Sequence, residues 1–82
     1  MSAENKGNAH AALHLIDLEN SIPDEKRTHD YHKAIISALG EVGGIHATLH
    51  LIDLEKSVPD EKRTYDYHKA IISALARAGR AV

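Results

Sequence analysis

The sequence predicts an all-α protein, a four-helix up-down-up-down bundle built from two near-identical αα-hairpins. The first observation is a repeat: residues 10–44 and 46–80 align without a gap, and 27 of the 35 aligned positions are identical. The second is that apolar residues within each copy recur at the three- and four-residue spacing of amphipathic helices. The third is a short corner containing one proline in the middle of each copy, which predicts antiparallel neighbouring helices.

The first helix is expected from about residue 9 to residue 20, after a flexible polar tail at residues 1–8. On a helical wheel, four apolar side chains of this helix and the corner share one narrow arc, which predicts the buried stripe. These residues are Ala11, Leu15, Leu18 and Ile22. A second arc carries polar residues at the same spacing, among them His10, His14 and Asp17. The helix therefore has one face for packing and one that is a candidate for binding.

The corner that follows predicts the start of the second helix. Ser21 is expected to cap that helix, with Pro23 in its first turn, where a missing N–H costs no hydrogen bond. The helix is expected to run from about residue 23 to residue 39, and glycines then end it. The second copy predicts helices at about 45–56 and 59–78. Together, residues 9–82 are expected to form a single domain of two hairpins, 9–44 and 45–80.

One short segment carries a family resemblance. The run from Ala34 to Gly43, AIISALGEVG, resembles the second helix of HEAT-type repeats, which often ends in an Ala-Leu-Gly-x-Ile-Gly pattern. The resemblance covers about ten residues, and the second copy departs from it by reading Ala-Leu-Ala-Arg-Ala-Gly. Each hairpin is also similar to a tetratricopeptide repeat in being a helical hairpin of similar length. These resemblances imply an alternative architecture in which two HEAT-like or tetratricopeptide-like hairpins stack side by side.

The few differences between the copies bear on their origin. Half of the eight differing positions lie at the joint between the copies or at its counterpart near the end of the chain. A recent tandem duplication predicts this pattern. An engineered single-chain fusion of a homodimeric helical hairpin, altered at its linker, predicts it equally well.

Composition narrows the expected setting of the protein. The chain has no cysteine, no apolar run long enough to span a membrane and no signal-peptide pattern, so a cytoplasmic protein without a membrane association is expected. A net charge of −2 and the absence of a basic stripe give no reason to expect a nucleic-acid partner. Histidine is the anomaly, with seven in 82 residues.

The histidines suggest a metal site in each copy. His10 and His14 lie one helical turn apart, and Asp17 lies a turn further on. Antiparallel pairing about residue 21 is expected to bring His32 level with His10. Such a set of imidazoles with a water suits zinc or another divalent transition metal. The counterparts in the second copy are His46, His50, His68 and Asp53.

The sequence favours the other interpretation, in which the histidines are partly exposed and hold no ligand. A duplicated unit doubles any histidine that arises by chance, so the independent positions are three or four rather than seven. The pattern also contains no His-Glu-x-x-His motif and no Glu-x-x-His pair.

For function, the sequence predicts a non-catalytic structural or binding module with no cofactor. It contains no nucleophile–base pair at helical spacing and no phosphate-binding loop. A small aliphatic core and wide apolar stripes predict self-association as a homodimer. The alternative is a zinc-type metal-binding four-helix protein that uses its histidine clusters, with metal-dependent hydrolytic activity if the metal keeps an open position.

Overall fold

The computed structural model describes the backbone of residues 2–81 and the side chains of residues 9–80. Its elements, in order, are α1 (Ser2–Asn20), the 3₁₀ turn η1 (Asp24–Lys26), α2 (Asp30–Val42), α3 (Gly44–Ser57), the 3₁₀ turn η2 (Asp60–Lys62) and α4 (Asp66–Ala81). The prediction of an all-α, four-helix protein is confirmed, and the described residues contain no strand. In this part of the chain no helix is both long and apolar enough to cross a membrane.

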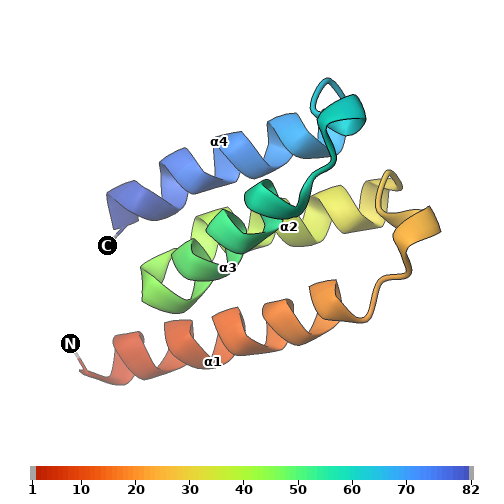
Figure 1. Ribbon diagram of the computed structural model, residues 1–82. Helices are drawn as coiled ribbons and strands as arrows, with labels where there is room; N and C mark the ends of the chain where they lie inside the picture. Colours follow the sequence, from red (N-terminus) through yellow and green to blue (C-terminus); the bar gives the residue numbers. More distant parts are fainter. Residues whose placement is uncertain (1, 82) are drawn as a thin grey trace.

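The two hairpins lie side by side, so that equivalent helices are neighbours. Helix α2 packs most extensively against α4, and α1 contacts both α2 and α3. In Figure 1, α1 and α4 form the two outer sides, α2 and α3 lie between them, and the two ends of the chain lie at the same end of the molecule. Each hairpin therefore has one side against the other hairpin and one outer side.

Glycine allows the closest approach between the hairpins. A Cβ atom at Gly40 of α2 would lie 2.8 Å from both the Cα and the Cβ of Ala74 in α4. The two helices can therefore lie this close only with glycine at position 40. Gly43 and Gly44 have φ angles of 66° and 83°, and they form the turn between α2 and α3. Gly43 caps the end of α2, as predicted, but Gly40 lies inside the helix, which therefore ends at Val42 rather than near residue 39.

The boundaries of α1, α2 and α4 differ from the prediction, and α4 begins at Asp66 rather than near residue 59 because the turn η2 precedes it. Helix α1 begins at Ser2, within the stretch expected to be a tail. The second helix begins at Asp30 rather than near residue 23, because the chain first makes the separate turn η1. Ser21 does not cap it, since its Oγ donates a hydrogen bond of 2.8 Å back to the Asp17 carbonyl. The connection between α1 and α2 therefore spans residues 21–29, which changes the level at which the two helices face each other.

The core consists of small and aliphatic side chains from all four helices. Its fully buried members are Ala12, Ile36, Leu39, Ala47, Leu51, Ile71, Ala74 and Ala78. The stripe predicted for the first helix is partly wrong: Ile22 is buried, but Ala11 is exposed and Leu18 is 42% exposed. Helix α1 packs against both α2 and α3, and the face that it buries there carries Ala12 and Glu19 instead.

Candidate functional site

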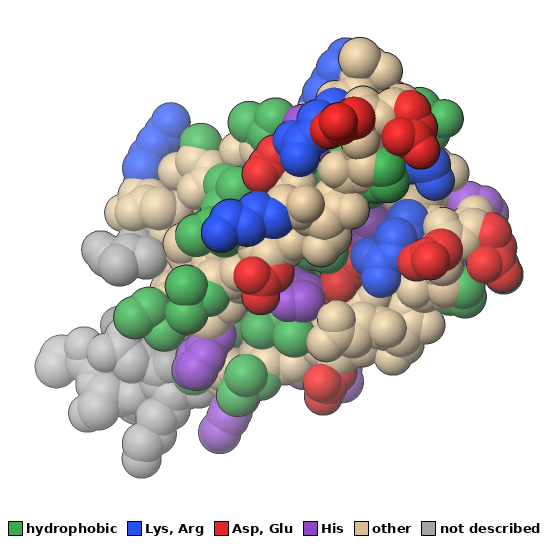
Figure 2. Space-filling model, in the orientation of Figure 1, with side chains coloured by type: hydrophobic (Ala, Val, Ile, Leu, Met, Phe, Trp, Pro, Cys, Tyr) green, Lys and Arg blue, Asp and Glu red, His purple; other side chains and the backbone are tan. Residues whose placement is uncertain are grey.

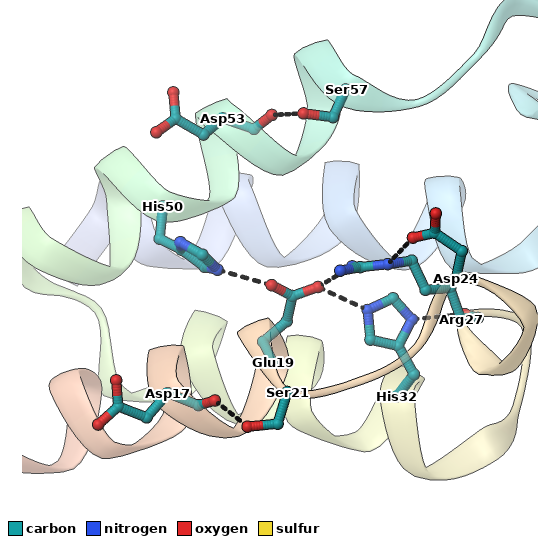
Figure 3. A network of polar contacts seen from close by, with 9 residues as sticks. All are labelled: Asp17, Glu19, Ser21, Asp24, Arg27, His32, His50, Asp53 and Ser57. Atoms are coloured by element: carbon teal, nitrogen blue, oxygen red, sulfur yellow. Dashed lines mark hydrogen bonds and ion pairs between the residues drawn. The ribbon is translucent and has the colours of Figure 1, made fainter.

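A buried glutamate is the centre of the main polar cluster. Glu19 lies in the last turn of α1, and its side chain is 1% exposed. Its Oε2 accepts hydrogen bonds from the Arg27 guanidinium and from Nε2 of His32, the latter at 3.0 Å. Its Oε1 accepts from Nε2 of His50 at 2.9 Å. Figure 3 shows the three donors converging on this carboxylate from different segments.

Each donor is placed by the element that carries it. Arg27 directly follows η1, and that turn directs its side chain back toward the end of α1. His32 lies in the first turn of α2, and His50 comes from α3 in the other hairpin. The Glu19–His50 contact therefore links the two hairpins, and the other two contacts fix the α1–α2 connection.

His32 is held through both of its ring nitrogens. Its Nε2 contacts the Glu19 carboxylate, and its Nδ1 contacts the backbone carbonyl of Arg27. These two contacts, one to each ring nitrogen, fix the orientation of the imidazole. The side chain is fully buried, and its ring lies 5.8 Å from the ring of Tyr67 in α4.

The surroundings of Glu19 favour its charged form. Burial alone would raise the pKa of Glu19, but the hydrogen bonds from His32 and His50 and the charge of Arg27 outweigh it. The pKa of Glu19 is therefore held well below its ordinary value. A carboxylate in this state is an ion-pair partner rather than a proton donor or a general base, because both of its oxygens already accept hydrogen bonds.

The second hairpin repeats the cluster with one partner fewer. Oε2 of Glu55 accepts from Arg63 at 2.6 Å and from Nε2 of His68 at 3.1 Å, and Nδ1 of His68 contacts the Arg63 carbonyl at 2.7 Å. The His68 hydrogen bond, followed by that of Arg63, lowers the pKa of Glu55. The Glu55 side chain is 29% exposed, and among the side chains of residues 9–80 no histidine reaches its Oε1.

The histidines predicted as metal ligands have separate surroundings. His10, His14 and His46 are exposed, whereas His32, His50 and His68 are engaged with glutamates. His32 is level with Glu19 rather than with His10, which is nine residues earlier and about 13 Å away along the helix. The predicted level was wrong because η1 lengthens the connection.

The aspartates predicted as metal ligands are also separate from the contacts between histidines and glutamates. Asp17 and Asp53 are exposed, and each accepts a serine hydrogen bond through its backbone carbonyl. Within residues 9–80 no three potential ligands are placed to hold a metal ion. A dication beside Glu19 would also face the Arg27 guanidinium, a like charge. Metal binding by His10, His14 and His32 stays a prediction.

The sequence prediction missed the glutamates and arginines of both clusters. Arg27 follows the turn η1 and points inward to Glu19. A signal for Glu19 was present: it lies three and seven residues after Ile16 and Ala12, which are partly and fully buried. On the wheel this places Glu19 among apolar residues, where a carboxylate requires partners.

A cavity of about 550 Å³ opens beside the first cluster, between the corner of the first hairpin and α3. Glu19 and His50 line it together with Arg27, Lys62 and Tyr67. In Figure 2 the face toward the viewer mixes acidic, basic and histidine side chains with apolar ones, and no single charge dominates it. Glu19, Arg27 and His50, which line the cavity, are already joined by the contacts described above.

No protein family, curated protein or solved structure matches this chain. Function therefore rests on the geometry of the chain itself.

Proposed function

We propose that the protein is a non-catalytic structural or binding module that acts by self-association. The observation that carries this proposal is a contrast between equivalent positions in the two hairpins. Tyr67 is 6% exposed against the first hairpin, but its equivalent Tyr31 is 46% exposed. Ile36 is fully buried, but its equivalent Ile72 is 51% exposed. The same side chains that pack between the hairpins are thus uncovered on the two outer sides.

The polar cluster supports a structural role for the buried charges. Glu19 is matched by three donors, and one of these, His50, belongs to the other hairpin. Such a network joins the hairpins in one arrangement, and it leaves neither carboxylate oxygen free for a substrate. An exposed apolar surface, by contrast, is typical of a contact with another macromolecule.

Sedimentation velocity from low to high micromolar concentration tests the proposal. The sedimentation coefficient is expected to rise with concentration, and Tyr31→Ser is expected to weaken this rise. Tyr65→Ser is the matched control, because Tyr65 is 43% exposed and its equivalent His29 is exposed as well, so neither packs between hairpins. A strict monomer over the whole range contradicts the proposal.

A further inference from the structure

We propose, building on self-association as the function, that the partner is a second copy of this chain stacked head to tail. In this arrangement the outer side of the second hairpin of one copy meets the outer side of the first hairpin of the next. The contact between copies then resembles the contact between the two hairpins of one chain. Its central polar pair is His14 of one copy with Glu55 of the other.

The contact inside the chain shows what the hairpins recognise in each other. Nε2 of His50 donates to Oε1 of Glu19 at 2.9 Å, across α1 and α3. Nζ of Lys33 lies 3.9 Å from Oδ2 of Asp66, across α2 and α4. Between these ion pairs, apolar groups such as Ile36 are fully covered. The first hairpin thus contributes a glutamate and a lysine, and the second a histidine and an aspartate.

The outer sides of the molecule carry the complementary halves of this contact. The first outer face is defined by His14, Asp30 and Tyr31. These residues are equivalent in the repeat to His50, Asp66 and Tyr67. The second outer face is defined by Glu55, Lys69 and Ile72. These residues are equivalent in the repeat to Glu19, Lys33 and Ile36. The two faces therefore carry complementary residues: glutamate for histidine, lysine for aspartate, and tyrosine for isoleucine.

Among the described side chains, Glu55 makes the same two contacts as Glu19 within its own hairpin and lacks the third contact, the one at Oε1. Its Oε2 holds Arg63 and His68 in the same way as Oε2 of Glu19 holds Arg27 and His32. The difference lies at Oε1, which in Glu19 accepts from the neighbouring hairpin. His14 is exposed, and it occupies the position from which His50 donates in the second hairpin.

One residue makes the contact between copies looser than the contact within the chain. Ala76 occupies the position equivalent to Gly40, where a Cβ atom would lie 2.8 Å from the backbone of Ala74. In the stack the partner's residue at this point is Ala38, the equivalent of Ala74. The methyl group of Ala76 holds the facing helices further apart than α2 and α4 are. Assembly is therefore reversible rather than permanent.

This contact is heterologous, because it joins two different faces. Such a contact does not close on itself in a pair, since each added copy leaves one face of each kind free. Concentration should therefore produce a series of species rather than a single dimer. A symmetric dimer would instead join the same face of both copies.

Two variants, each with one blocked face, test the arrangement by sedimentation velocity. The variant His14→Glu with Tyr31→Glu blocks only the first outer face, and Lys69→Glu with Ile72→Glu blocks only the second. Either variant alone is expected to be monomeric, because each head-to-tail contact needs both faces. An equimolar mixture is expected to form a one-to-one pair that grows no further. All four positions are at the surface, and far-UV circular dichroism of each variant checks that the helices are retained.

The outcomes separate this inference from the proposed function. If the wild type stays monomeric, self-association itself is wrong and the stack falls with it. If the wild type associates but one blocked variant still does so alone, or their mixture stays monomeric, only the head-to-tail arrangement is overturned. Ala76→Gly is expected to tighten wild-type association about tenfold, which corresponds to about 1.4 kcal/mol. Unchanged or weaker association of Ala76→Gly overturns the match between the outer faces and the contact within the chain.

Discussion

Replacing Glu19 with glutamine removes the negative charge on which three donors converge, while the size of the side chain is kept. The change leaves Arg27, whose side chain is 25% exposed, without its counter-charge, and it leaves the fully buried His32 without its carboxylate partner. Removing one partner of a buried ion pair costs about 3–5 kcal/mol. Because Arg27 retains some solvent and the amide oxygen still accepts a hydrogen bond, we expect the lower end, about 3 kcal/mol. Urea unfolding followed by far-UV circular dichroism measures this loss.

Glu55→Gln is the matched control, since Glu55 has the equivalent arginine and histidine donors from its own hairpin and, within residues 9–80, lacks only the third donor from the other hairpin. Its side chain is 29% exposed, and its partner Arg63 is 40% exposed. Water screens this pair, so the free energy of unfolding is expected to fall by much less than in Glu19→Gln. Equal losses in the two variants would refute the reasoning, because burial would then not be the property that makes Glu19 important.

Three further outcomes are expected. Because the pKa of Glu19 is lowered in the folded state, its stabilisation is present above the unfolded value of about 4.3 and is lost as the pH falls further. The difference in unfolding free energy between wild type and Glu19→Gln should therefore shrink below that pH, as a pH series of urea titrations measures. Gly40→Ala is expected to lower the melting temperature, because over-packing against Ala74 costs about 1–3 kcal/mol and outweighs a helix-propensity gain of up to about 1 kcal/mol. Ala76→Gly, at the equivalent exposed position, should lose only the propensity term when it is measured at a concentration at which the chain is monomeric. Excess zinc near neutral pH is expected to leave the melting temperature unchanged, whereas a rise would support the metal site predicted around His32.

Local patterns in the sequence were sufficient to predict the helices. Apolar periodicity predicted all four α-helices. The glycines at 43 and 44 predicted the turn between the hairpins, and their positive φ angles confirm it. These features depend on neighbouring residues alone. The start of the second helix was misplaced because Pro23 suits either the first turn of an α-helix or the entry to a 3₁₀ turn. That local ambiguity then moved the predicted partner of His32 from Glu19 to His10.

The surroundings of the glutamates could not be predicted from local patterns. Glu19 and Glu55 lie in the same Leu-Ile-Asp-Leu-Glu segment, yet only Glu19 accepts a hydrogen bond from a third donor. Ile36 and Ile72 also share a local sequence, but one is buried and the other is half exposed. In both pairs the residue of the first hairpin is covered by the second hairpin, and nothing described covers its equivalent. The repeat therefore specifies two complementary faces on each hairpin. With two hairpins in the chain, one face of each hairpin is covered by the other hairpin and the second face is left exposed. A further hairpin with the same first face, supplied by another copy of the chain, gives Glu55 the surroundings that Glu19 already has.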